Sequence, residues 1–106
     1  MNHQTEKDFL KAVVEMANLF GWQVAHFRPG LNRRGQWQTA VAADGAGFPD
    51  LVMVNENRFH ALFVELKVNG DLSAEQYEWI HNLQMAGEKA YVWTPDDWTE
   101  IEEALK

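Results

Sequence analysis

Three charged residues lie in or beside two apolar segments, and they are the strongest candidates for chemistry. Asp50 directly precedes the segment 51–54, and Glu65 and Lys67 lie within the segment 59–68. A charged side chain among apolar neighbours is costly to bury unless it is paired or bound to a metal. Mg²⁺ prefers oxygen ligands and often takes only one or two protein carboxylates. These residues therefore predict either a site for a divalent cation or a structural ion pair at a strand end.

The divalent-cation interpretation also indicates a type of reaction. A bound cation can activate a water molecule and polarise a phosphoryl oxygen. The ammonium group of Lys67 can stabilise negative charge that develops on a phosphate, or orient the attacking water. The combination therefore favours hydrolytic chemistry at a phosphate.

The spacing of the three residues places them on one face of a β-sheet. Side chains alternate between the two faces of a strand, so Glu65 and Lys67 share a face. A hairpin loop with an even number of residues pairs even positions with odd ones, and the most symmetric register places Asp50 opposite Phe63. Glu65 is then the diagonal neighbour of Asp50, with backbone positions about 7–8 Å apart and carboxylates able to converge.

Two further polar residues are expected on the inward faces of helices. Glu6 lies on the apolar stripe of the segment 5–20, and Gln76 shares a helix face with Ile80. Each has a second interpretation. An acid near a helix N-terminus is favourable in itself, and Gln76 completes a capping box that begins at Ser73.

Positive charge is concentrated in one segment of an acidic chain. The net charge is −7 and the isoelectric point is about 4.9, so the overall basic charge typical of nucleic-acid-binding domains is absent. No Asp or Glu occurs in residues 16–43, which contain Arg28, Arg33 and Arg34. This segment predicts either a loop that follows a phosphate backbone or a solvated loop without a ligand.

The remaining pattern predicts the elements that position these residues. Apolar residues at helical spacing, with Thr5 as N-cap, predict a helix over 5–20. A second helix begins after Ser73 and ends near residue 86, and a third begins at Pro95. Strands are expected at 22–28, 37–43, 51–54, 59–68 and 90–93. The predicted fold is α/β in the order α-β-β-β-β-α-β-α, with a mixed sheet, a right-handed crossover before the last strand and helices on both faces.

The length and composition limit the class of protein. The 106 residues are expected to form one domain that spans 1–106. The chain has no cysteine, which excludes a disulfide framework, a cysteine zinc site and a thiol nucleophile. No apolar run approaches the ~18 residues of a membrane span, and the N-terminus lacks the apolar core of a signal peptide. We therefore expect a cytoplasmic protein without a membrane partner.

Several motifs occur in order along the chain: TEKDFLKAVVEMANLFGW, GFPDLVMV, VELKVNGDLSAEQ and WIHNLQMAGEKAYVWTPDDW. Together they resemble the virus-type replication-repair nuclease (VRR-NUC) domain of the PD-(D/E)xK nuclease superfamily. The resemblance implies a restriction-endonuclease-like core with Asp50 and Glu65 as metal ligands and Lys67 as the catalytic lysine. It also implies that Gln76 lies near the site and that Glu6, as the acid of the first helix, is a further metal ligand.

The resemblance also implies a function. It predicts a Mg²⁺- or Mn²⁺-dependent DNA endonuclease of the stand-alone phage or bacterial type, which leaves a 5′-phosphate and a 3′-hydroxyl. Such a protein is expected to act in DNA repair as a homodimer on four-way (Holliday) junctions, in the cytoplasm of a bacterial or phage-infected host cell. A two-fold dimer suits a junction in which two strands are cut symmetrically. The alternatives are a flap, nick or general DNA nuclease, and a non-catalytic DNA-binding subunit on the same scaffold.

Overall fold

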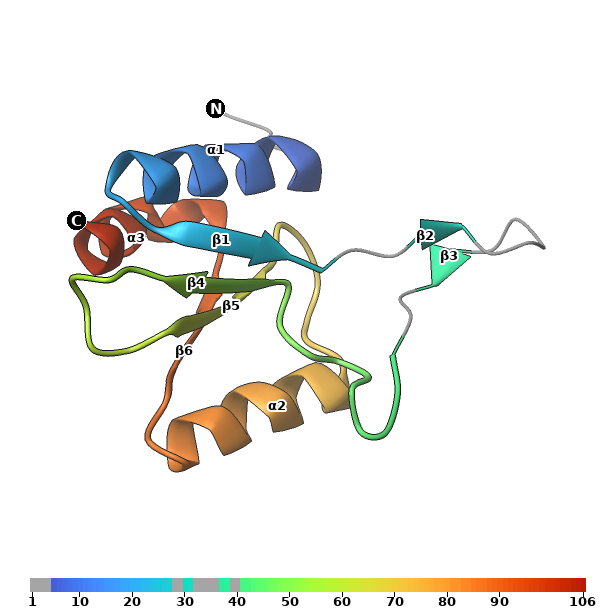
Figure 1. Ribbon diagram of the computed structural model, residues 1–106. Helices are drawn as coiled ribbons and strands as arrows, with labels where there is room; N and C mark the ends of the chain where they lie inside the picture. Colours follow the sequence, from blue (N-terminus) through green and yellow to red (C-terminus); the bar gives the residue numbers. More distant parts are fainter. Residues whose placement is uncertain (1–4, 28–29, 32–36, 39–40) are drawn as a thin grey trace.

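Three α-helices and six strands make up the part of the chain that the computed structural model describes, which is residues 5–27, 30–31, 37–38 and 41–106 (Figure 1). The helices are α1 (Glu6–Leu19), α2 (Ala74–Met85) and α3 (Trp98–Leu105), and the 3₁₀ turn η1 (Pro95–Asp97) precedes α3. The strands are β1 (Gln23–His26), β2 (Gly30–Leu31), β3 (Trp37–Gln38), β4 (Leu51–Val54), β5 (Leu62–Leu66) and β6 (Lys89–Trp93). No helix within these ranges is both long and apolar enough to cross a membrane.

Four of the strands form a mixed sheet in the order β1-β4-β5-β6. β4 is antiparallel to both β1 and β5, whereas β5 and β6 are parallel. A parallel pair needs a crossover connection, and α2 supplies it. β2 and β3 pair with each other in a separate two-stranded sheet. The predicted α/β class with a mixed sheet is therefore confirmed.

Helices cover both faces of the four-stranded sheet. α1 and α3 pack together on one face, and α2 lies on the other (Figure 1). The side chains of Leu51 and Val64 are fully buried in the main core, together with residues of α1 and α3. Side chains next to them in sequence point to the opposite face of the sheet. Asp50, Glu65 and Lys67 are therefore on the α2 side.

The residues that predict the helix ends occupy the expected positions. The Thr5 hydroxyl accepts a hydrogen bond from the backbone N–H of Asp8 at 3.0 Å, which satisfies one free donor of the first turn. Gly21 ends α1 with a φ of +92°, a conformation that other residues rarely adopt. Ser73 and Gln76 form the capping box of α2. The three predicted helices are therefore present near their expected limits.

Three strand predictions need correction. β5 begins at Leu62 rather than at Phe59, which is fully exposed in the longer β4–β5 loop. The segment between the strands expected at 22–28 and 37–43 contains β2, whose Leu31 pairs with Trp37 of β3. One short strand is thus added to the predicted order. The strand expected at 37–43 is also shorter, because β3 contains only Trp37–Gln38 and residues 41–43 are not in a strand. Periodicity cannot show these features, because two-residue strands and strand ends depend on which segment pairs with which.

Candidate active site

Asp50 and Glu65 lie side by side at one end of the sheet, on the α2 face. Leu51 pairs with Val64 in the β4–β5 register, so the next pair outward is Asp50 opposite Glu65. Residues directly opposite in antiparallel strands have Cβ atoms about 4.5–5.5 Å apart. The predicted register, with Asp50 opposite Phe63, is wrong by two residues because the loop is longer. Even-numbered positions still pair with odd-numbered ones, as predicted. The two acids are therefore closer than in the predicted diagonal arrangement.

The backbone holds Asp50 at this position from two sides. Its Oδ2 atom accepts a hydrogen bond from the backbone N–H of Leu66 at 3.0 Å. Its backbone carbonyl accepts one from the N–H of Phe27 at 2.8 Å, which continues the β1–β4 pairing. The preceding Pro49 is fully buried and restricts the backbone φ at that position. The carboxylate therefore projects from a well-restrained segment.

Glu65 is the buried acid of the pair, with 3% of its surface exposed. The pKa of Glu65 is raised from 4.5 to about 8, mainly by burial, and also by the negative charge of Asp50 and a hydrogen bond to the Asp50 side chain. The ammonium of Lys67 and the backbone N–H of Asp50 lower the pKa, but less strongly. Two nearby carboxylates repel each other when both are ionised. Glu65 therefore retains its proton in most molecules at neutral pH until a positive charge approaches.

Gln76 links α2 to this acid. Its Nε2 group donates a hydrogen bond to Oε2 of Glu65 at 3.1 Å. Its Oε1 atom accepts one from the backbone N–H of Ser73 at 2.9 Å, and the Ser73 hydroxyl accepts one from the Gln76 N–H at 3.1 Å. The two interpretations of Gln76 are thus not alternatives, because one amide group caps the helix and also contacts the buried acid.

Lys67 continues β5 on the same face as Glu65. Its backbone N–H donates to the carbonyl of Trp93 at 2.9 Å, which extends the pairing with β6 by one residue. The side chain is partly exposed, and its charge favours the ionised form of Glu65. A flexible ammonium group is therefore available beside the acid pair.

Glu6 is not part of this cluster. Its side chain is exposed in the first turn of α1, whereas Phe9, Val13 and Ala17 form the buried face. The prediction that Glu6 points inward is wrong. The later turns of α1 lie over the core, but Glu6 precedes them and is exposed. α1 also packs on the face opposite Asp50. Within the described ranges, no three or more Asp, Glu, His or Cys side chains are arranged to hold a metal, so the role of Glu6 as a further ligand stays a prediction.

The three arginines predicted to contact nucleic acid lie outside the described residues. Arg28, Arg33 and Arg34 belong to the ranges 28–29 and 32–36. Their proposed contact with a phosphate backbone therefore stays a prediction from the sequence.

Gly47 allows the segment before Asp50 to approach α2 closely. It has a φ of +83°, and a Cβ atom at this position would lie 2.6 Å from the Cβ of Glu75 and 2.8 Å from the backbone nitrogen of Gln76. Any larger residue would push the loop and the helix apart. The sequence signal for this contact was the glycine of the GFPD motif, but a glycine alone does not show what it approaches.

Trp79 fastens the same loop one helical turn further along α2. Its indole N–H donates a hydrogen bond to the carbonyl of Asp44 at 3.0 Å. Its ring meets Phe48 edge to face, with centroids 5.0 Å apart. The Trp79 side chain is partly exposed, and these two contacts restrain the loop that positions the acid pair.

The acid pair has the donor chemistry of a Mg²⁺ or Mn²⁺ site. Both side chains offer oxygen ligands, and Mg²⁺ is often held by one or two carboxylates while it keeps several waters. The pKa of Glu65 is raised partly by the negative charge of Asp50, and a cation between the two would offset that charge. Asp50 and Glu65 therefore offer oxygen ligands that suit such an ion.

The chain matches a known protein-family model. The model of the VRR-NUC domain matches residues 32–96, which are more than half of the chain. The matched range contains Asp50, Glu65, Lys67 and Gln76 but not Glu6. No curated protein and no solved structure matches the chain.

Proposed function

The chain belongs to the VRR-NUC family, and from this premise we propose that it is a Mg²⁺- or Mn²⁺-dependent endonuclease that hydrolyses phosphodiester bonds in DNA. Family membership implies a nuclease-type function with DNA as the substrate. The observation that supports the metal-dependent mechanism is the position of Asp50 next to the buried Glu65, whose pKa is raised by burial and by the negative charge of Asp50. A divalent cation supplies that charge and prefers these ligands.

Each residue has a separate role in this proposal. Asp50 and Glu65 hold the cation, which when bound lowers the pKa of a water molecule and polarises a phosphoryl oxygen. Lys67 places its ammonium group beside the scissile phosphate and offsets the negative charge that develops there. Gln76 restrains the Glu65 carboxyl group through the 3.1 Å hydrogen bond. A water oxygen loses a proton and bonds to phosphorus, while the bond from phosphorus to the 3′ oxygen breaks and this oxygen takes up a proton from solvent, so the products are a 5′-phosphate and a 3′-hydroxyl.

The proposal extends to four-way junctions as the preferred substrate and to a homodimer as the active form. It rests on the family resemblance and on symmetry, because a two-fold dimer with one site in each chain matches two symmetric cuts. Flaps, nicks and linear duplexes are the competing substrates. Arg28, Arg33 and Arg34 are assigned to contacts with the phosphate backbone in this proposal.

Cleavage of labelled four-way junctions, flaps and linear duplexes tests these assignments. The wild-type protein should cut DNA in Mg²⁺ or Mn²⁺ but not in EDTA. Asp50→Ala and Lys67→Ala should reduce cleavage about a hundredfold or more while the fold is retained. Glu56→Ala is the matched control, because Glu56 is an exposed acid in the β4–β5 loop at the other end of the strands.

Two results would contradict the proposal. Full activity in Asp50→Ala would remove the catalytic assignment of the acid pair. A folded wild-type protein that binds the junction but does not cut any substrate with metal present would favour the non-catalytic DNA-binding subunit.

A further inference from the structure

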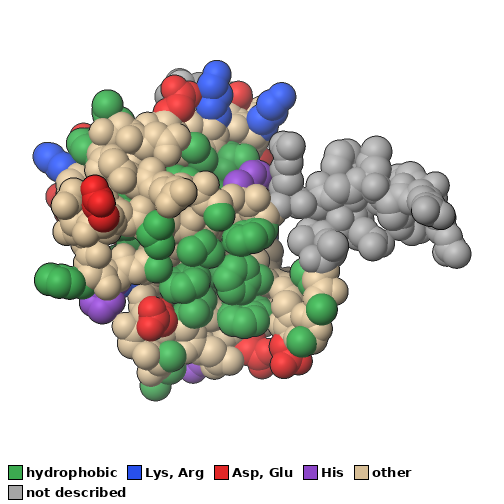
Figure 2. Space-filling view, viewed as in Figure 1, with side chains coloured by type: hydrophobic (Ala, Val, Ile, Leu, Met, Phe, Trp, Pro, Cys, Tyr) green, Lys and Arg blue, Asp and Glu red, His purple; other side chains and the backbone are tan. Residues whose placement is uncertain are grey.

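Four aromatic rings form a continuous patch on the α2 side of the sheet. Phe48 meets each of the other three edge to face, with centroid distances of 5.8 Å to Phe27, 6.3 Å to Phe63 and 5.0 Å to Trp79. None of the four is buried, and Phe27 is 48% exposed. Hydrophobic side chains gather in the middle of the face shown in Figure 2, between the sheet and α2. We call these four rings the aromatic patch.

The aromatic patch is open because α2 covers only one edge of the sheet. α2 packs mainly against β6, where Ile80 and Ala90 are buried. On the same face, Ala25 of β1 is exposed and Val54 of β4 is 46% exposed. Contiguous apolar surface beside a cluster of polar groups usually marks a binding site.

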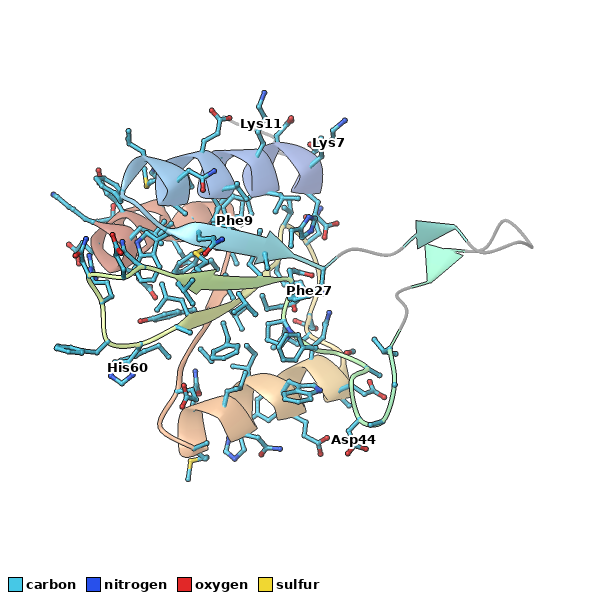
Figure 3. The ribbon with its side chains drawn as sticks, viewed as in Figure 1. Lys7, Phe9, Lys11, Phe27, Asp44 and His60 are labelled. Atoms are coloured by element: carbon cyan, nitrogen blue, oxygen red, sulfur yellow. The ribbon has the colours of Figure 1, made fainter. Side chains whose placement is uncertain are left out.

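The aromatic patch is continuous with the acid pair. The backbone N–H of Phe27 contacts the carbonyl of Asp50, and Figure 3 shows Phe27 near the end of β1. Phe63 precedes Glu65 by two residues on the same face, which is about 7 Å along a strand. A phosphate held at the acid pair therefore has its own nucleoside within reach of the exposed rings.

We propose that the aromatic patch receives an unstacked nucleobase next to the scissile phosphate, so that the site favours DNA in which this nucleotide is unpaired or lies at a branch point, where base stacking is interrupted. The inference rests on the proposed nuclease function. Aromatic side chains stack on bases of any sequence because every base has a π-face. A base inside a duplex must first leave its stack, whereas an unpaired base does not. A second protein chain is the less suitable occupant, because it would also cover the adjacent acid pair.

Cleavage selectivity tests the proposal with matched substrates and variants. The substrates are duplexes of one sequence, either fully paired or with one unpaired nucleotide at successive positions around the cut. The wild-type protein should cut the best unpaired substrate about tenfold faster in Mg²⁺. Phe27→Leu keeps apolar bulk but removes the ring, and it should lose this preference, whereas Phe27→Tyr should keep it.

Phe59→Leu is the control for loss of an exposed ring. Phe59 is fully exposed in the β4–β5 loop, and its neighbour His60 lies at the other end of the sheet from Phe27 in Figure 3. This variant should retain the wild-type preference. The preference of the wild-type protein needs no variant to fold, so the test does not depend on the stability of Phe27→Leu.

Fluorescence of 2-aminopurine at the unpaired position reports stacking directly. In a Lys67→Met background, which prevents cleavage, binding should lower the emission, and Phe27→Leu should abolish this decrease. Equal cleavage of paired and unpaired substrates, or an unchanged decrease in Phe27→Leu, would overturn the proposal. If sedimentation shows that the wild-type protein is a dimer and Phe27→Leu is not, the proposal would be overturned as well, because the aromatic patch would then bind a second copy of the chain. No cleavage of any substrate by the wild-type protein contradicts the nuclease function instead, and the fluorescence still decides whether the patch binds a base.

Discussion

Binding of Mg²⁺ should release a proton from Glu65, and the number released follows from the pKa. In the cation-free protein, burial and the neighbouring Asp50 raise the pKa of Glu65 from 4.5 to about 8. At pH 7, which is about one unit lower, roughly nine in ten molecules carry the proton. A carboxylate must be deprotonated to hold a metal. Binding at pH 7 should therefore release about one proton per chain.

The same linkage determines how metal affinity depends on pH. Below a pKa of about 8 for Glu65, each unit decrease in pH should weaken the apparent affinity about tenfold, because protons and metal compete for one carboxylate. Above that pH the affinity should become constant. An ordinary exposed acid pair would show no such change near neutral pH.

Calorimetric titration with MgCl₂ in two buffers of different ionisation enthalpy measures the released protons. The wild-type protein and the control Glu56→Gln should each release about one proton at pH 7. Glu65→Gln should release none and bind the ion more weakly. Clear binding of Mg²⁺ by the wild-type protein without proton release would refute the reasoning, because Glu65 would then be either ionised beforehand or not a ligand.

Three further outcomes concern stability. Without metal, the free energy of unfolding should decrease as the pH rises from 4.5 to about 8, because the folded state binds the Glu65 proton more tightly than the unfolded chain does. Urea titration should show this decrease in the wild-type protein but not in Glu65→Gln. An equal decrease in both proteins would contradict the prediction. Gly47→Ala should lower the free energy of unfolding by about 1–3 kcal/mol more than Gly70→Ala does, because both glycines have positive φ but only Gly47 lies against α2. Equal decreases in chemical denaturation would show that the contact between Gly47 and α2 is not tight. Ser73→Ala should lower the free energy of unfolding by about 1 kcal/mol, because it removes the N-cap of α2. An unchanged melting temperature would contradict this prediction.

The shared face of Asp50 and Glu65 could be predicted because it depends only on strand alternation and on the parity of the loop. The direct opposition of Asp50 and Glu65 across the two strands could not be predicted. The residues around Phe59 are as apolar as a strand, so the sequence does not show that pairing begins only at Leu62. The strand limit is decided by the partner strand, which periodicity does not contain.

The two helical candidates show a different limit. The position of Gln76 was predicted from its capping motif and from its helix face, and both features operate together in the structure. For Glu6, helical periodicity indicates which way the side chain points, but it does not show where along the helix the core ends. Glu6 precedes the buried residues of α1 and remains exposed. The contacts of Gly47 and Trp79 bring together segments about thirty residues apart, and local patterns carry no information about such pairs.

Anomalous diffraction from crystals grown with Mn²⁺ tests most directly whether Asp50 and Glu65 hold one divalent cation. We expect an anomalous peak bonded to an oxygen of each carboxylate, at about 2.1 Å. No peak between these residues, with the Glu65 side chain still hydrogen-bonded to Asp50, would contradict the proposed metal site.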